Sequence, residues 1–269
     1  MIGILCFFFF VGLAFSETIP VVLNFSARVG KSPFACGQTY EGIGLTSSTI
    51  KPRDFRLYLH NIRLINESGK EVALELEQDG KWQLDNLVLL DFEDGTGPCS
   101  NGTPDTNMVI RGAAPRASYK GVRFTVGVPA SRNHSDIAGQ PSPLNLTAMF
   151  WAWNAGHKFI RIEFASTGQP RGYVIHIGST RCVAGNCRDG NRTEVELLGF
   201  DPTREPIIAD LAELLKTSNV DQNQKGTGEG CMSAPDDSDC AGIFRKLGLA
   251  FGKTRSGPQT FFHKQEMRN

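Results

Sequence analysis

The chain has 269 residues, and its 28 basic side chains balance its 28 acidic ones. Without a formal net charge the chain has no overall attraction to nucleic acid or to anionic lipid, so neither class of partner is expected. Its length is sufficient for one sizeable domain with its own core.

The first sixteen residues, MIGILCFFFFVGLAFS, form a short apolar block that ends in Ala14-Phe15-Ser16. The small-x-small ending is typical of a signal-peptidase site, and the block is too short to span a bilayer comfortably. We therefore expect residues 1–16 to be a signal peptide that is removed together with Cys6. The mature protein is then periplasmic or secreted, with no stable membrane span.

Strand patterns dominate the rest of the chain. From Thr18 to Val29 apolar residues fall on alternate positions, the period of a strand with one buried face. Further strands are expected at residues 54–65, 71–77, 87–92, 121–128, 146–153, 158–164, 173–178 and 193–199. Short strands separated by Gly, Pro and Asn predict an all-β fold, an antiparallel sandwich or barrel.

One segment departs from this pattern. Ile208, Leu211, Leu214 and Leu215 have helical spacing, which predicts a short helix over residues 206–217 near the C-terminal end. A polar, Gly-rich loop is expected at 218–229, and the final FFHKQEMRN as an added strand or a tail. We expect residues 17–252 to form one β domain and residues 253–269 a tail.

Six cysteines remain after the signal peptide: Cys36, Cys99, Cys182, Cys187, Cys231 and Cys240. An even number in an oxidising compartment predicts disulfides that staple loops, although the sequence leaves their connectivity open. The near pairs, Cys182 with Cys187 and Cys231 with Cys240, lie in stretches where a local bridge would fix a loop. A zinc site would prefer tighter two-residue spacings.

Three of the five histidines stand out. His60 and His176 interrupt apolar strands, and His134 lies in the loop ASRNHSDIAG. A single imidazole in such a place is commonly a hydrogen-bonded structural residue. Two or three neutral imidazoles on a β scaffold also suit copper or zinc, and an exported setting favours copper.

The stretch TAMFWAWNAGHKFIRI holds two of the three tryptophans. On a strand, Met149, Trp151 and Trp153 share one face, so both indoles should approach the same region of the protein. Core packing explains this pattern by itself.

The sequence lacks the motifs of common enzyme classes. It contains no His-Glu-x-x-His, no Gly-x-Ser-x-Gly, no phosphate-binding loop and no blue-copper arrangement of cysteine, histidine and methionine. The acidic turns DFEDGTG and PDDSD do not match regular calcium-loop spacing and are expected to be solvated turns. We therefore expect a protein that is not an enzyme.

Several runs together resemble one known family. These are DFRLYLHNIRLIN, LLDFEDGTGPCSNGT, FTVGVP with NHSD, PSPLNLTAMFWAWNAGHKFIRI, HIGSTRC, and LLGFDP with GCMSAPDDSDC, which extend over about residues 20–249. In order and spacing they resemble the MbnP-like family, exported copper-binding proteins of the metallo-mystery pair, multi-cysteine type, first linked to methanobactin operons.

The resemblance implies a copper-binding β-sandwich outside the cytoplasm, encoded with a dihaem MauG-like peroxidase, also called MbnH-like. In the family the peroxidase oxidises a tryptophan of the copper protein to kynurenine, whose aromatic amine adds a nitrogen donor. The candidates here are Trp151 and Trp153.

The resemblance implies three copper ligands, His60, His134 and His176, with the Met232 thioether as a weaker candidate. It leaves out His157, where the family commonly lacks histidine, and His263, which lies outside the matched region. The copper would serve homeostasis or a chaperone role. The alternative is a secreted β-sandwich that acts as a structural or interaction module without metal.

Overall fold

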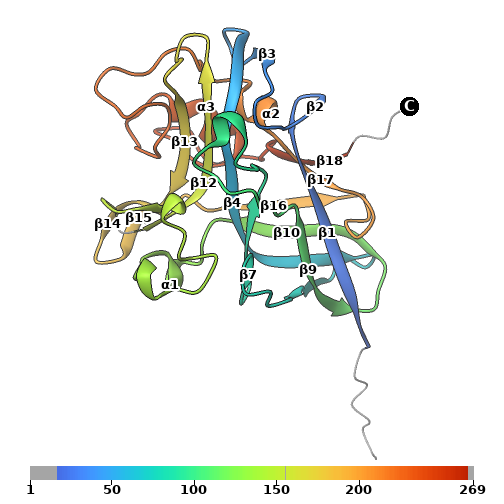
Figure 1. Ribbon diagram of the computed structural model, residues 1–269. Coiled ribbons are helices and arrows are strands. Elements are labelled where there is room, and N and C mark those ends of the chain that lie inside the picture. Colours follow the sequence, from blue (N-terminus) through green and yellow to red (C-terminus); the bar gives the residue numbers. More distant parts are fainter. Residues whose placement is uncertain (1–16, 155, 266–269) are drawn as a thin grey trace, which may run out of the picture.

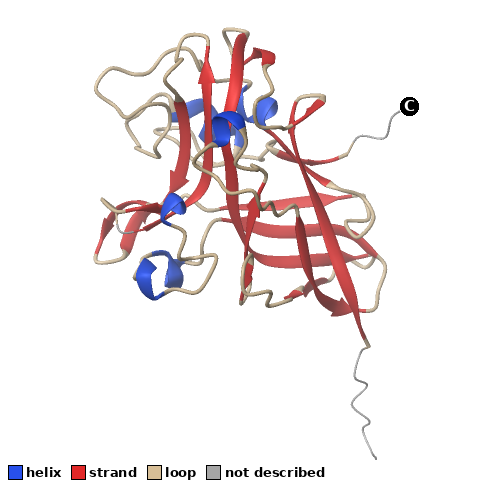
Figure 2. Ribbon diagram, in the orientation of Figure 1, coloured by secondary structure: helices blue, strands red, loops and turns tan. Residues whose placement is uncertain are grey.

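The computed structural model describes residues 17–154 and 156–265. The expected signal peptide, residues 1–16, lies outside the described residues. Two β-sheets enclose one apolar core (Figures 1 and 2), and the all-β sandwich-like fold is confirmed. No helix in the described part of the chain is long and apolar enough to cross a bilayer.

The first sheet is built on β1 (Thr18–Val29), whose predicted alternation holds, with Val21, Leu23 and Phe25 buried. Its order is β18-β17-β1-β9-β6, and β2 also pairs with β1. The partners of β1 are antiparallel except β17, which runs parallel to it. The bounds are Ser32–Pro33 for β2, Glu75–Leu76 for β6, Val109–Pro115 for β9, Ile207–Asp210 for β17 and Phe262–Lys264 for β18.

The second sheet is built on the long β4 (Ser48–Asn66). One edge of β4 pairs first with β12 and then with β10, while β3, β8 and β5 pair with the other edge. Outside these, β13 pairs with β12, β16 with β10, β11 with β12 and β7 with β8. The bounds are Tyr40–Ile43 (β3), Glu71–Ala73 (β5), Gln83–Leu84 (β7), Leu87–Asp91 (β8), Tyr119–Val126 (β10), Phe150–Trp151 (β11), Gly156–Ser166 (β12), Tyr173–Gly178 (β13) and Thr193–Leu198 (β16).

A separate hairpin joins β14 (Thr180–Val183) to β15 (Asn186–Asp189). The helices are short: α1 is Ala130–Asn133, α2 is Leu211–Leu215 and α3 is Cys240–Lys246. Three 3-10 turns cover Gly97–Cys99, Ile137–Gly139 and Thr147–Met149. Disulfides join Cys36 to Cys99, Cys182 to Cys187 and Cys231 to Cys240, as the cysteine count predicts.

The main core fills the space between the sheets. Phe124 on β10 packs edge-on against Phe25 of β1 and Phe262 of β18, and this links both sheets. A smaller cluster lies on the opposite face of β4, where Tyr58, Leu89 and Phe159 meet side chains of the segment 128–149. Both faces of the β4 region are therefore covered, which explains its nearly continuous burial.

Two predicted elements are wrong in part. Residues 207–210, expected in a helix, form the strand β17, and only Leu211–Leu215 is helical. Ile207, Ile208 and Ala209 are consecutive and all fully buried, so both faces of β17 are covered, and a strand buried on both faces loses its alternation. The expected strand 146–153 is a 3-10 turn followed by the two-residue β11.

Candidate functional site

The predicted site residues gather mainly at one end of β12 and β13. There the segment carrying both tryptophans, the α1 turn with His134 and the β14–β15 hairpin come together (Figure 1). These segments lie on the face of the second sheet that is turned away from the main core.

His176 on β13 is held by a carboxylate. Its Nε2–H donates to Glu163 Oε1 across the β12–β13 pair at 2.8 Å. Burial lowers the pKa of His176, so the ring is neutral at neutral pH. Its Nδ1 is buried and has no hydrogen-bond partner among the described residues. A neutral imidazole with one nitrogen fixed by a carboxylate and the other unpartnered is the arrangement in which histidine binds metals.

Glu163 belongs to a buried ionic network across β4 and β12. Its Oε1 also accepts a bond from Arg161 Nε at 2.8 Å, and Arg161 Nε lies 3.0 Å from Asp54 Oδ2. Asp54 in turn binds Arg56 through two bonds. Burial raises the pKa of Glu163, but the hydrogen bonds from His176 and Arg161 outweigh it and lower the value to about 2. Glu163 is therefore a carboxylate at any working pH.

The same network anchors the tryptophan segment. Lys158 Nζ donates to the carbonyl oxygen of Ala148 at 2.8 Å, and Arg161 Nη1 donates to the same oxygen at 3.0 Å. Burial lowers the pKa of Lys158 to about 8. These two cationic donors to one carbonyl oxygen fix the turn that leads directly into β11, and so fix the position of the Trp151 backbone.

Trp151 and Trp153 are neighbours with different surroundings. Their ring centroids lie 5.2 Å apart at an interplanar angle of 40°. Trp151 is only 3% exposed and Trp153 is 66% exposed. The Trp151 Nε1 is buried without a hydrogen-bond partner among the described residues. The two indoles lie close together, as predicted. The reason differs from the predicted one, because Trp153 lies in a turn after β11 and does not share a strand face with Trp151.

Trp151 rests on Gly178 of β13. A Cβ built on Gly178 would lie 2.5 Å from Trp151 Cζ3 and 2.8 Å from the His157 carbonyl oxygen. Side chains two residues apart on a strand share a face, so Trp151 covers the same face of β13 from which His176 projects. The indole can therefore approach this strand because Gly178 has no side chain.

Replacing Gly178 with alanine should therefore displace the Trp151 indole. We expect a red shift of the tryptophan emission, because the ring gains solvent contact, and a loss of about 1–3 kcal/mol of stability from overpacking. Gly139→Ala is the matched control, since a Cβ there meets nothing within 4 Å. Emission and stability identical to wild type in Gly178→Ala would contradict the close contact.

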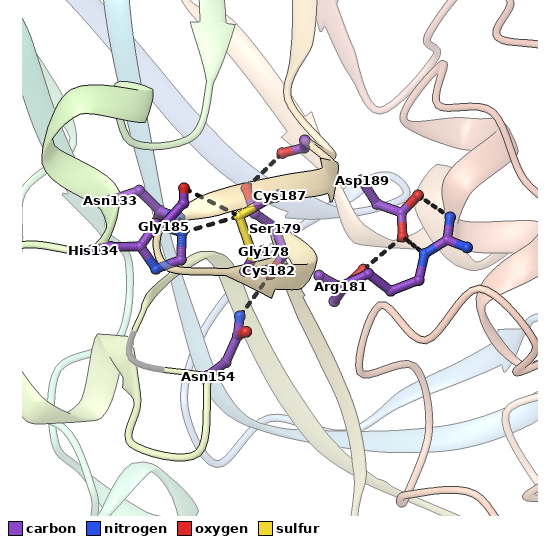
Figure 3. The surroundings of a disulfide bond; sticks show 12 residues. Asn133, His134, Asn154, Gly178, Ser179, Arg181, Cys182, Gly185, Cys187 and Asp189 are labelled. Atoms are coloured by element: carbon purple, nitrogen blue, oxygen red, sulfur yellow. Dashed lines mark hydrogen bonds and ion pairs between the residues drawn. A yellow bond between two sulfur atoms is a disulfide. The ribbon is translucent and has the colours of Figure 1, made fainter.

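His134 follows α1 and faces a disulfide (Figure 3). Its Nε2 lies 3.0 Å from Cys187 Sγ and 2.9 Å from the side-chain nitrogen Nδ2 of Asn133. A Cβ on Gly156 would lie 3.0 Å from His134 Cε1, and Gly156 pairs with Trp151 in the β11–β12 ladder. His134 and Trp151 therefore flank the same end of β12.

His60 lies farther away, on β4. Its Nδ1–H donates to the Gly127 carbonyl oxygen at 2.8 Å, and burial lowers its pKa. Arg56 of β4, Arg161 of β12 and His176 of β13 are paired in register across the sheet. His60 lies four residues after Arg56 on β4, so its side chain projects from the same face. The structure thus puts His60 and His176 on the same side of the sheet, but with separate partners.

The two histidines left out of the predicted site also have partners. Each ring nitrogen of His157 lies 2.9 Å from a backbone carbonyl oxygen, of Asn133 or of Leu144, and the residue is fully buried. Its hydrogen bonds tie α1 and the loop before Trp151 to β12. His263 is on β18, where its Nδ1 lies 2.9 Å from the Lys264 carbonyl oxygen.

Two groups of potential metal ligands have their donor atoms within 4.8 Å of one another in the described residues. One is His134 with Cys182 and Cys187, and the other is Glu93 with Cys36 and Cys99. Glu93 already accepts the amide hydrogens of Gly95 and Thr103. Neither group contains His60 or His176, so the three predicted imidazoles do not form one ligand group in this arrangement.

Sequence reasoning missed Glu163 and Gly178. The former contacts His176 only through the β12–β13 register, and the latter matters only because Trp151 folds onto it. The alternation of Arg161 and Glu163 with apolar residues in FIRIEF was the available signal.

Comparisons with known proteins agree with this architecture. The family model MbnP matches residues 18–233. The solved structure of MbnP from Methylosinus trichosporium superimposes with a TM-score of 0.82 and 32% sequence identity, over 91% of this chain and 98% of that chain. No curated protein matches the chain. The family model covers most of the chain, including the segments with His60, His134, His176 and both tryptophans, and the chain belongs to the MbnP family.

Proposed function

We propose that this chain is an exported, non-enzymatic copper-binding protein, whose site lies around His176 and Trp151 and is completed by oxidation of a tryptophan. One observation carries the proposal. His176 Nδ1 and Trp151 Nε1 are both buried without hydrogen-bond partners in the described part of the chain. Buried polar atoms are normally paired, so an unpaired imidazole nitrogen on the face of β13 that Trp151 covers supports a binding site there.

The donors present fit copper. Imidazole nitrogen binds both copper oxidation states, and a buried neutral ring needs no deprotonation before it binds. The hydrogen bond to Glu163 occupies Nε2 of His176, so Nδ1 is the nitrogen that would bind copper. His60 donates through Nδ1, which leaves its Nε2 available. His134 is the third imidazole, and Met232, which is partly buried beside Gly228, is a possible soft thioether donor.

We assign the oxidation to Trp151 and a relay role to Trp153. The exposed Trp153 ring can approach the haem of a dihaem MauG-like peroxidase, and its contact with Trp151 gives the electron hole a path inward. Two peroxide molecules each transfer one oxygen atom to the indole and leave as water, so that the C2–C3 bond is cleaved and both oxygen atoms are retained in N-formylkynurenine. Hydrolysis of the resulting formamide releases formate and leaves kynurenine with a free aromatic amine.

The copper site is tested by Cu(I) titration against a competing chelator, using protein co-expressed with the peroxidase. We expect His176→Ala to weaken binding by more than about 100-fold, since even outer-shell partners of a metal are worth about 10–100-fold. His60→Ala and His134→Ala should weaken it less. His263→Ala is the control, because that ring lies on β18 in the other sheet. Unchanged affinity in all three site variants would refute the assignment and favour a module without metal.

Peptide mass spectrometry tests the tryptophan step. The peptide containing Trp151 should gain one oxygen and lose one carbon only when the peroxidase is present. Trp151→Phe should abolish this change, and Trp153→Phe should slow it while leaving the modified residue the same. Modification of Trp153 itself would reverse the assignment of the two indoles.

A further inference from the structure

The disulfide Cys182–Cys187 differs from the other two in its accessibility. It joins paired residues of the β14–β15 hairpin, and both its cysteines are partly exposed. By contrast, Cys231 and Cys240 are fully buried, and in the third bridge Cys36 is partly exposed while Cys99 is fully buried. Thiol–disulfide exchange needs access for the attacking thiolate, so a dithiol reaches the hairpin bridge first.

This disulfide also has an imidazole beside it. His134 Nε2 is 3.0 Å from Cys187 Sγ, and the donor atoms of His134, Cys182 and Cys187 all lie within 4.8 Å of one another (Figure 3). Hydrogen bonds of neighbouring residues fix the surroundings on two sides. Asn154, from the tryptophan turn, donates to the Ser179 carbonyl oxygen at 2.7 Å, and Ser179 donates to the Gly190 carbonyl oxygen at 2.9 Å.

We propose that reduction of this disulfide creates a second metal site, in which the Cys182 and Cys187 thiolates and the His134 imidazole bind one Cu(I) ion. Thiolate sulfur with one imidazole nitrogen is the soft donor set that Cu(I) prefers. The site goes beyond the one proposed around His176 and shares only His134 with it. Reduction of the hairpin thus determines which site His134 serves.

The redox step balances with a dithiol as reductant. A thiolate of the dithiol attacks one cysteine sulfur, the S–S bond breaks, and a mixed disulfide forms. The second thiol of the reductant resolves it, so two electrons and two protons pass to Cys182 and Cys187 and the reductant leaves as its disulfide. Binding of Cu(I) then releases the two thiol protons.

The first test measures which disulfide opens. The purified chain is treated anaerobically with increasing dithiothreitol, alkylated, and analysed by peptide mass spectrometry. Alkylation of Cys182 and Cys187 should reach completion at a lower dithiol concentration than that of the other four cysteines. Simultaneous opening of all three disulfides would overturn the proposal.

The second test measures metal uptake. After the dithiol is removed, Cu(I) is titrated against bicinchoninate, with thiolate-to-copper absorption recorded in the ultraviolet. The reduced chain should bind one equivalent more than the oxidised chain. His176→Ala should keep this extra equivalent while losing the first, which separates failure of this site from failure of the proposed function.

Two variants and one chemical control define the ligands. The extra equivalent and its absorption should vanish in Cys182→Ser/Cys187→Ser and in reduced wild type alkylated at these two cysteines, a control that needs no folding of a variant. His134→Ala should weaken the extra equivalent by about tenfold or more. Retention of the extra equivalent after alkylation would overturn the site.

Discussion

Arg56→Met is expected to destabilise the fold by roughly 3–5 kcal/mol, because it breaks the buried ion pair with Asp54, which then keeps only Arg161, and removes the cation beside the buried Glu93. Arg56 donates to both oxygens of Asp54, and its Nη1 lies 3.8 Å from Glu93 Oε1. Its side chain is 3% exposed, and those of Asp54 and Glu93 are fully buried. Burial also raises the pKa of the adjacent Asp91 to about 8, although the charge of Arg56 lowers it, so this region tolerates little further negative charge.

Chemical denaturation of Arg56→Met and of Arg63→Met gives a matched comparison. Arg63 is on the same strand and pairs with Glu71 and Glu194, but its side chain is 24% exposed and its partners are more so. Its loss should cost only about 1 kcal/mol or less. Adding Asp54→Asn to Arg56→Met should recover part of the lost stability. Equal losses in the two single variants would show that the network is not buried in the folded protein.

Acid should destabilise the protein strongly between about pH 4.5 and pH 2, and Glu163 should account for much of this. A pKa lowered in the folded state, here from 4.5 to about 2, contributes stability that is complete above the unfolded value and is lost as the pH falls through the folded value. The side chain is 16% exposed, so solvent screening is small, and the shift corresponds to roughly 3 kcal/mol.

Denaturation at a series of pH values should show this slope in wild type and a shallower one in Glu163→Gln. The glutamine cannot titrate, so it removes the proton uptake that drives the loss. Glu75→Gln on the exposed edge strand β6 is the control and should retain the wild-type slope. If Glu163→Gln is as sensitive to acid as wild type, the hydrogen bonds of Glu163 do not stabilise its charged form.

The sequence predicts those parts of the fold that local periodicity governs. The alternation in β1 and the apolar runs of β4, β8, β10, β12 and β13 specify strands, and the even cysteine count predicts the bridges. Hydrophobic periodicity fails to predict a strand where tertiary contacts override the pattern. Buried on both faces, β17 has no alternation, and β9, with its Gly112 and paired alanines, has too little apolar contrast to stand out.

The site was predictable only in its residue types. Histidines and tryptophans can be chosen from sequence, but their proximity depends on a cross-strand register, on the turn after β11 and on the absence of a side chain at Gly178. Neither the contact of His134 with a disulfide nor the carboxylate behind His176 is local in the chain. Such contacts are fixed by topology, which periodicity does not encode.

The first sheet assembles late, because β1 pairs in parallel with β17, and β17 pairs in antiparallel fashion with β18. The first strand to emerge, whether from a ribosome or across a membrane, has partners near the other end of the chain. Closing so long a loop is slow, and an unpaired strand edge can recruit other chains. Truncation after α3 would remove β18 and leave β17 as the edge of the sheet, so the last strand of the domain protects the edge of β17 from pairing with other chains.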